Sequence, residues 1–491
     1  MNRREFLVNT ALAAAALPTV PAFSAVAGSP GRDKLIGIQI PAVSFVDEGV
    51  EAVLDNVQRL AAVNTIFITV LAFNDGLAGR QLKGFPFPDH GKKIYLGDDG
   101  FKGGYYATLH PKFHKSPLYE AFRSPDLPGF DVLKEVIPAA RKRGLKTYVF
   151  FADNIRHGVK AFENLVERSR TGQPRGEVCM NNESYREVLF GLLADCLTSY
   201  DVDGLLYRSE RIGPLSKTMG LTHLGFSEPT CFCEHCQRLG RAQGINLARV
   251  QEGYEKLEGF VAQSRAGKRP NDGFHVTFLR LLLRYPEILQ WQTFQTDSLQ
   301  RMYRDVYAFV KKDRPRTQVG WAIAVNNGLN PFYRAEQDWP AMAPYSDFLK
   351  VTMYESVIGN RMAKYIENAT MAWYGDLTPE QMLELEYAIM GYNQPGFSEL
   401  TTKGFSSEYI TNETRRIRTG LGDAPTQVLA GIDVDLPSAG NERNLGAAGL
   451  KTSVEAALRG GSDGIILSRK YSEMNLKTLS GAGEAVRTWR G

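Results

Sequence analysis

Asp201-Val202-Asp203-Gly204-Leu205-Leu206-Tyr207-Arg208-Ser209-Glu210 is the stretch from which the rest of the chain is best interpreted. An acidic turn leads into a short apolar run of strand length, which ends in tyrosine, arginine and glutamate. Polar side chains of this kind follow a buried strand where the strand opens toward solvent, as they do at the carboxyl face of a parallel barrel. The stretch therefore predicts a strand that ends at a functional site.

Seven further segments also have the composition of strands, and helical patterns separate them. They are residues 35–45, 65–73, 145–151, 318–325, 347–354, 427–434 and 463–468. Parallel strands need helical crossovers, and eight such strands close on themselves, so we expect an α/β fold of the (β/α)8 TIM barrel type. An open doubly wound sheet is the alternative, but the chain has no glycine-rich phosphate loop that would favour it.

Helices are predicted between these strands from the i, i+3, i+4, i+7 spacing of apolar residues. The expected helices are 48–63, 131–144, 182–200, 275–312, 378–390, 406–419, 450–460 and a last one after residue 469. Two segments are too long for simple connections, namely 74–130 after the second strand and 212–272 after the fourth. We expect both to be large insertions that shape one face of the barrel.

The first 27 residues have the pattern of a twin-arginine export signal. Asn2-Arg3-Arg4-Glu5-Phe6-Leu7 precedes an alanine-rich apolar stretch, which ends near Ala25-Val26-Ala27. A membrane anchor is the alternative, although spanning a bilayer takes about 20 apolar residues. We expect residues 1–27 to be removed and residues 28–491 to form a barrel domain that is periplasmic or secreted and free of the membrane.

The amino-acid composition limits which classes of molecule the protein is expected to bind. Lys and Arg number 58 against 54 Asp and Glu, for a net charge of +4, and basic residues do not cluster with aromatic ones. This balance argues against a nucleic-acid partner. The aromatic fraction of 11% suits a carbohydrate-binding cleft and a large core equally well. We expect a carbohydrate partner on the grounds given below, and self-association into a homo-oligomer stays open.

Four of the five cysteines have the spacing of metal ligands. Cys231, Cys233 and Cys236 lie within one tight loop, and Cys179 precedes the helix that leads into the fourth strand. Four thiolates can hold a tetrahedral structural zinc ion. The alternatives are a disulfide with free thiols, or His235 in place of one cysteine. The fifth cysteine, Cys196, shares the apolar face of its helix and is expected to be a small buried residue.

Carboxylates follow three of the predicted strands, and in a barrel they would meet at one face. Glycoside cleavage needs two of them, one protonated to donate to the leaving oxygen and one ionised. Glu210 is the best acid/base candidate, Asp433 or Asp435 would be the nucleophile or base, and Glu355 is the alternative partner. Glu210 could instead form a surface salt bridge, and the aspartates could cap backbone amides. Expected substrate-binding residues are Asp153, Asn154, Tyr207, Arg208, Asn326, Tyr354 and Arg469.

Several motifs resemble those of glycoside-hydrolase barrels found in secreted bacterial proteins. They are Cys179-Met180-Asn181-Asn182, Tyr185-Arg186, Tyr200-Asp201-Val202-Asp203-Gly204 and Cys231-Phe232-Cys233-x-x-Cys236. The cysteine spacing is similar to the zinc site of family 42 β-galactosidases. That resemblance implies Glu210 as the acid/base and a nucleophile at strand seven. The sequence departs from the family in having Ser209 before Glu210, and aspartates rather than a glutamate at strand seven.

These observations favour an exported glycoside hydrolase with paired carboxylates at the carboxyl face of the barrel. Two other hypotheses remain. In one, the barrel binds carbohydrate without cleaving it. In the other, the cysteine-bound metal takes part in catalysis on a carbohydrate.

Overall fold

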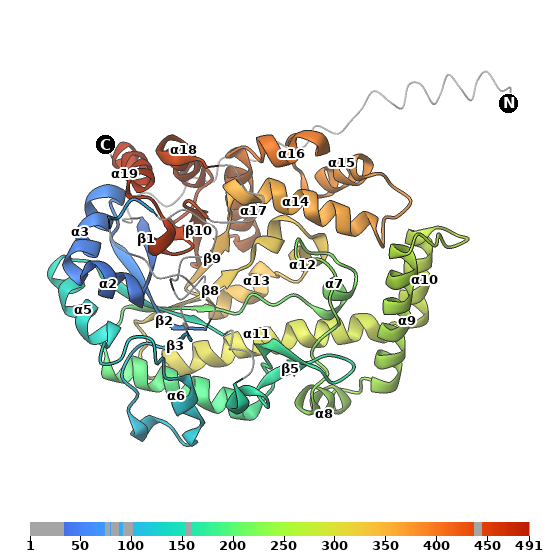
Figure 1. Ribbon diagram of the computed structural model, residues 1–491, viewed down its shortest axis with the longest axis horizontal. Coiled ribbons are helices and arrows are strands. Elements are labelled where there is room, and N and C mark those ends of the chain that lie inside the picture. The colour runs from blue at the N-terminus through green and yellow to red at the C-terminus, as the bar shows by residue number, and fades with distance from the viewer. Residues whose placement is uncertain are drawn as a thin grey trace. The chain divides into compact units, whose positions relative to one another are not determined.

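Eight parallel strands form a closed ring in the computed structural model of the chain (Figure 1). β1 pairs with β2 on one side and with β11 on the other, which closes the barrel. A short strand, β3 (Gly104–Tyr105), adds to β2 in the antiparallel direction. The predicted (β/α)8 barrel is confirmed. The barrel strands are β1 (Leu35–Pro41), β2 (Thr65–Ala72), β4 (Lys146–Ala152), β7 (Gly204–Arg208), β8 (Gln318–Ile323), β9 (Phe348–Thr352), β10 (Gln427–Asp433) and β11 (Gly464–Ser468).

The structure describes residues 34–73, 79, 88–91, 102–153, 159–436 and 444–490. The expected export signal over residues 1–27 lies outside these residues, as do Asn154 and much of the insertion 74–130. Those expectations stay predictions. Among the described residues, every helix is too short or too polar to cross a bilayer.

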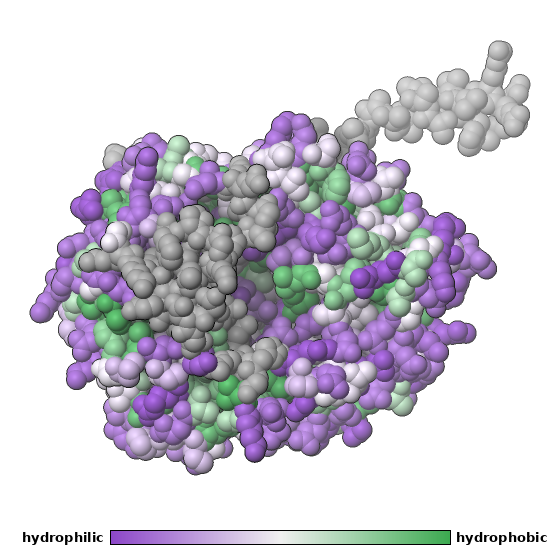
Figure 2. All heavy atoms as spheres, viewed as in Figure 1, coloured by the Kyte–Doolittle hydropathy of each residue, from purple (hydrophilic) through white to green (hydrophobic). Residues whose placement is uncertain are grey.

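Helices surround the barrel and make the connections between its strands (Figure 1). On the face seen in Figure 2, hydrophilic residues cover most of the described surface, and hydrophobic residues form small scattered groups. The helices therefore turn their apolar sides toward the strands. The helices are α2 (Ala42–Glu48), α3 (Val50–Ala61), α5 (Val132–Lys142), α6 (Glu183–Ser199), α7 (Pro214–Thr218), α8 (Glu234–Ala242), α9 (Leu247–Arg265), α10 (Phe274–Arg284), α11 (Glu287–Asp313), α12 (Pro331–Ala335), α13 (Trp339–Met342), α14 (Glu355–Thr370), α15 (Pro379–Met390), α16 (Phe397–Lys403), α17 (Glu408–Leu421), α18 (Gly446–Arg459) and α19 (Leu476–Arg490).

Aromatic rings and glycines fill the barrel near the amino ends of its strands. The rings of Phe67 and Phe348 both contact Tyr148, with centroids 5.0 and 5.7 Å from it. A Cβ atom on Gly204 would lie 2.5 Å from the Tyr148 ring, and one on Gly320 would lie 2.4 Å from Phe348. The glycines thus leave the space that the rings occupy, and the interior is a packed core rather than a channel.

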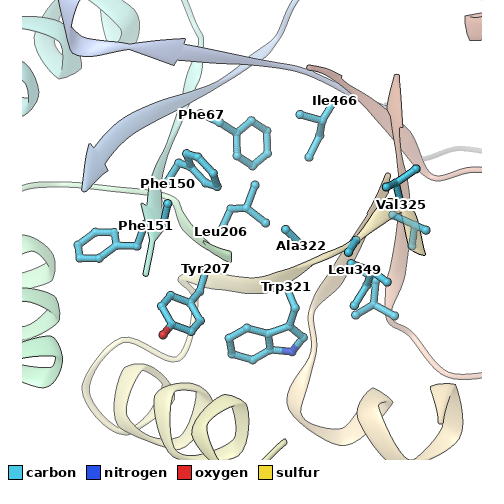
Figure 3. Close-up of a cluster of buried hydrophobic side chains, with 14 of the residues drawn as sticks. Phe67, Phe150, Phe151, Leu206, Tyr207, Trp321, Ala322, Val325, Leu349 and Ile466 are labelled. Atoms are coloured by element: carbon cyan, nitrogen blue, oxygen red, sulfur yellow. The ribbon is translucent and has the colours of Figure 1, made fainter. Parts of the chain in front are cut away.

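Residues along each strand alternate between the interior and the helix layer. Figure 3 shows Phe150 and Leu206 pointing into the barrel, whereas their neighbours Phe151 and Tyr207 point outward. This alternation is the ordinary consequence of strand geometry. It determines which strand-end residues reach the mouth of the barrel and which lie behind its wall.

Several parts of the fold differ from the sequence-based expectation, among them the following. Residues 42–45, the end of the predicted strand 35–45, instead belong to α2, because a short apolar run is compatible with either structure. The expected helix 275–312 is two helices, α10 and α11, separated at Tyr285 and Pro286. Helix α14 was not predicted. A two-stranded hairpin, β5 (Val166–Arg168) and β6 (Pro174–Val178), was also not predicted.

Candidate active site

Glu210 lies at the mouth of the barrel, just beyond the end of β7. It accepts a hydrogen bond of 2.6 Å from Arg208, and the two side chains are 18% and 23% exposed respectively. The pair thus belongs to the barrel mouth rather than to the open surface. Burial opposes the charge on Glu210, but the charges of Arg208, Lys350 and Arg361 outweigh it and lower the pKa of the carboxyl group. Glu210 is therefore ionised at neutral pH.

Asp433 ends β10 and has the opposite electrostatic character. Its side chain is 2% exposed, and one carboxyl oxygen accepts hydrogen bonds from the backbone and hydroxyl group of Ser356. Burial raises the pKa of this carboxyl group more than Ser356 and the Arg361 charge lower it. The Asp433 Oδ1 atom is buried and has no hydrogen-bond partner within the described part of the chain.

Two cations that the sequence analysis did not single out act on Glu210, and one of them also acts on Asp433. Lys350 points into the barrel from β9, and its Nζ atom donates to Tyr354 at 3.3 Å. Arg361 lies on α14, with its guanidinium 6.0 Å from the centre of the Tyr354 ring. The charge of Arg361 acts on both Glu210 and Asp433. The alternation of β9 could have identified Lys350 in advance, but nothing in the sequence pattern distinguished Arg361.

Further polar groups complete the mouth. Asn326 is 3% exposed, and its Oδ1 atom has no hydrogen-bond partner among the described residues. His223 lies near it, and burial together with the Arg361 charge lowers the pKa of the imidazole to about 4. His223 is thus neutral at pH 7. Arg469 forms a two-point ion pair with Glu473 at 3.1 and 2.9 Å. The structure therefore gathers Glu210, Arg208, Tyr354, Asn326, Arg469 and Asp433 at one end of the barrel.

Asp153 and Tyr207, expected to bind substrate, are not part of this group. Both are almost fully buried, at 2% and 0% exposed. The Asp153 carboxylate accepts hydrogen bonds of 2.6 Å from Ser209 and from Arg211. The Tyr207 hydroxyl lies 3.3 Å from that of Tyr185 on α6, behind the barrel wall. Strand alternation explains both positions, because each residue follows an inward-pointing neighbour.

Two carboxylates that were candidate partners of Glu210 serve other contacts. Glu355 begins α14 and accepts a hydrogen bond of 2.7 Å from Ser453 on α18. Asp435 accepts hydrogen bonds of 2.8 and 3.0 Å from the backbone and side chain of Asn475, just before α19. Asp435 thus makes the backbone-capping contact that was the alternative to a catalytic role. Among the candidate partners, Asp433 is the one with a buried carboxyl oxygen that lacks a hydrogen-bond partner among the described residues.

Replacing Asp435 by alanine is expected to lower the free energy of unfolding by about 1–2 kcal/mol, because the start of α19 loses a carboxylate acceptor. Turnover should stay close to that of the parent protein. Denaturant unfolding and a steady-state assay measure the two effects. Asp89 accepts hydrogen bonds from Leu476 and Lys477 at the same helix end, so Asp89→Ala is the matched control. A large loss of turnover in Asp435→Ala alone would return this residue to the catalytic candidates.

The four predicted metal-binding cysteines lie together and are buried. Their sulfur atoms are all within 4.8 Å of one another. The Cys179 sulfur lies 3.4 and 3.5 Å from those of Cys233 and Cys236. A tetrahedral zinc ion with bonds of about 2.3 Å would separate its sulfurs by about 3.8 Å. The donor set therefore fits a tetrahedral metal with little adjustment.

The surroundings of this four-cysteine cluster also suit thiolate ligands. The backbone N–H of Arg168 donates to the Cys231 sulfur at 3.4 Å, and Asn181 donates to Cys236 at the same distance. Helix α8 begins directly after Cys233, so its positive end faces the cluster. All five cysteines are free, and the His235 side chain pairs with Glu234 at 3.7 Å. The four cysteines therefore form no disulfide, and His235 does not take the place of a cysteine in the cluster.

A small cavity of about 40 Å³ borders the four-cysteine cluster, between Cys179, Cys231 and Glu336. One water molecule needs roughly 10–15 Å³, so the cavity can hold a few waters. Sites for small-molecule ligands occupy about 300–1,000 Å³. A sugar ring therefore does not fit beside the cysteines.

Comparison with known proteins identifies relatives by fold alone. No family model and no curated protein matches the chain. A β-galactosidase from the haloarchaeon Halorubrum lacusprofundi aligns at 12% identity with a TM-score of 0.50, over 93% of this chain and 58% of that one. A β-galactosidase from Marinomonas ef1 aligns at 10% identity with a TM-score of 0.50, over 93% and 59%.

The glycoside hydrolase domain of PgaB from Bordetella bronchiseptica also aligns, at 12% identity and a TM-score of 0.46, over 93% of this chain and 98% of that domain. This chain spans less than two thirds of the length of the two β-galactosidases. At these identities the likeness establishes a shared barrel fold. It does not by itself establish a shared activity.

Proposed function

We propose that this protein is a glycoside hydrolase in which Glu210 and Asp433 are the two catalytic carboxyl groups. The observation that carries the proposal is their opposite electrostatic setting at one barrel mouth. Cations lower the pKa of Glu210, and burial raises that of Asp433. Two carboxyl groups held in different protonation states are what glycosidic bond cleavage requires.

The electrostatic settings of the two carboxyl groups favour different catalytic roles for Glu210 and Asp433 from those that the sequence suggested. Asp433, whose pKa is raised by burial, would donate its proton to the leaving oxygen. Glu210, the ionised group, would attack the sugar or activate a water molecule. The resemblance to family 42 β-galactosidases implies Glu210 as the acid/base, but three nearby cations work against a protonated Glu210.

A sugar would also meet unsatisfied polar atoms at this mouth. Asn326 Oδ1, Asp433 Oδ1 and His223 Nδ1 are buried and have no hydrogen-bond partner among the described residues. Buried polar atoms in native proteins are almost always hydrogen-bonded. Sugar hydroxyl groups both donate and accept hydrogen bonds, so a bound saccharide could satisfy these atoms. Solved structures that share the fold include proteins named as β-galactosidases, which supports a sugar substrate.

Turnover of a panel of 4-nitrophenyl glycosides tests the proposal. Release of nitrophenol from at least one member is expected, with reducing sugar formed in equal amount. A panel covering α- and β-linked neutral and acidic sugars without any release would count against hydrolase activity. Saccharide binding in the same experiment would then favour the non-catalytic carbohydrate-binding hypothesis.

The pH dependence of kcat/KM should be bell-shaped, because activity needs an ionised Glu210 and a protonated Asp433. The acid limb should lie below pH 4.5, the ordinary value for a glutamate, since the pKa of Glu210 is lowered. The alkaline limb should follow the raised pKa of Asp433. In Lys350→Met, loss of one nearby cation should move the acid limb upward by up to about 1 pH unit.

Lys364→Met is the control for that shift. Lys364 lies on the same helix as Arg361 and pairs with Glu367 at the surface. Its removal should leave both limbs in place. An acid limb that does not move in Lys350→Met would show that Glu210 is not the ionised group whose titration limits activity.

We also propose that the four cysteines hold a structural zinc ion. Their four sulfurs would fill a tetrahedral coordination sphere, which leaves no open position for substrate or water. The adjoining cavity of about 40 Å³ is too small for a sugar. Export by the twin-arginine route is part of the same proposal, and N-terminal sequencing of protein recovered from the periplasm tests it.

A further inference from the structure

Arg361 is a cation at the candidate active site that forms no ion pair with any described carboxylate, although Glu210 and Asp433 act on it from a distance. It is half-buried on the second turn of α14. Within the residues that the structure describes, it makes no hydrogen bond and no ion pair, and its one recorded contact is with the Tyr354 ring. Burial lowers the pKa of its guanidinium, and the charges of Asp433 and Glu210 offset this loss of hydration only in part.

Within the described part of the chain, the ion pairs near Arg361 join other cations to carboxylates. Arg208 pairs with Glu210, Arg211 with Asp153, and Arg469 with Glu473. Lys470 shares Glu473 at 3.5 Å. Lys350 donates only to hydroxyl groups, those of Thr352 and Tyr354. Among the described residues, Lys350 and Arg361 are thus two cations near Glu210 that form no ion pair with a carboxylate.

Tyr354 brings the two unbalanced cations together. Its ring lies 5.3 Å from Lys350 Nζ and 6.0 Å from the Arg361 guanidinium. Both charges act on Glu210. A ligand that contacts Glu210 at this mouth would thus lie within reach of Arg361 as well.

The chemistry of the guanidinium group defines what such a ligand would offer. Arginine presents planar, paired N–H donors that match the two oxygens of a carboxylate or of a sulfate group. A half-buried charge without an ion-pair partner among the described residues costs stability, so its retention at a ligand-binding mouth is best explained by an anion that arrives with the ligand.

We propose, building on the glycosidase function proposed above, that the substrate is an acidic saccharide whose carboxylate or sulfate group is bound by Arg361. Lys350 adds to the positive field without contacting the anion directly. Neutral sugars lack the group that pairs with Arg361. The acidic substituent thus determines which glycan is bound.

Calorimetric titration of the mature protein with monosaccharides tests this inference. The probes are glucuronate, galacturonate and glucose 6-sulfate, with glucose and galactose as neutral counterparts. At least one acidic sugar should bind more tightly than its neutral counterpart, and added salt should reduce only that preference. Comparing the affinities of the uronates with that of the sulfate ester shows whether Arg361 binds a carboxylate or a sulfate group.

In Arg361→Met, the affinity for the acidic sugar should fall about 10- to 100-fold, the loss expected for charge-assisted hydrogen bonds. Neutral sugars should bind as before. Arg361→Lys should recover part of the preference, because charge is kept while the paired donors are lost. Arg280→Met is the matched control. Arg280 lies on α10 and forms an exposed ion pair with Asp272.

Equal binding of acidic and neutral sugars overturns the inference, as does an acidic preference that survives in Arg361→Met. Failure of every acidic sugar to bind overturns it too. These outcomes are separate from failure of the proposed function. Hydrolysis of neutral glycosides alone would retain the hydrolase and refute the acidic substrate. Acidic sugar binding without turnover of any acidic glycoside would retain the Arg361 site and refute the hydrolase.

Discussion

Replacing Glu210 by glutamine is expected to lower kcat by about 10²- to 10⁴-fold, while saccharide binding is largely retained. Glutamine has nearly the same shape and can still accept a hydrogen bond from Arg208, so the mouth keeps its geometry. What is lost is the negative charge needed to attack the sugar or to activate water. Steady-state hydrolysis of whichever aryl glycoside the parent protein cleaves measures the change, and calorimetry measures binding.

Glu355→Gln is the matched control for this variant. Glu355 also follows a strand, but it contacts Ser453 between α14 and α18. Its glutamine variant should keep kcat within a few-fold of the parent value. Unchanged turnover in Glu210→Gln would remove Glu210 from the mechanism. A large loss in Glu355→Gln instead would favour the alternative pairing considered from the sequence.

The barrel could be predicted because its strands are buried on both faces. Buried parallel strands appear as continuous apolar runs, and Thr65–Ala72 is an example in which every residue is buried. The same property explains the error at residues 42–45. An apolar run after Pro41 is equally compatible with a helix, and only tertiary packing selects α2.

The site was harder to predict than the fold, since strand-end position alone does not say which way a side chain points. Asp153 and Glu210 both follow barrel strands, yet Asp153 pairs with Arg211 behind the wall and Glu210 lies in the mouth. The alternation along β7 could have separated Tyr207 from Arg208. Arg361 reaches the mouth from a helix that the sequence pattern did not predict, so no argument from strand ends could have found it.

The cysteine cluster could be predicted because metal sites need a specific spacing of ligands that ordinary cores do not. Cys231, Cys233 and Cys236 are close in the chain, and the fold brings Cys179 to them across 54 residues, at 3.4 Å from Cys233. Cys196, on the same helix face as the apolar residues, stays apart and buried. Spacing thus distinguished the four ligands from the fifth cysteine.

Replacing Cys236 by serine is expected to lower the thermal midpoint by on the order of 10 °C and to abolish stoichiometric metal binding. Serine is a poor zinc ligand at neutral pH, and three remaining thiolates packed within a few ångströms would repel one another. Differential scanning calorimetry and metal analysis by mass spectrometry measure the two effects. The parent protein should contain one zinc ion per chain.

Cys196→Ala is the control for Cys236→Ser, because it removes a buried thiol that is not one of the four proposed metal ligands. It should retain the zinc ion and shift the midpoint only slightly, because its small side chain lies outside the cluster. Chelation of the parent protein should lower the midpoint and activity together, since a structural ion acts on the sugar only through the fold. If chelation abolished turnover while the midpoint stayed in place, the metal would belong to the catalytic machinery, and the small cavity beside Cys179 and Cys231 would have to open to admit substrate.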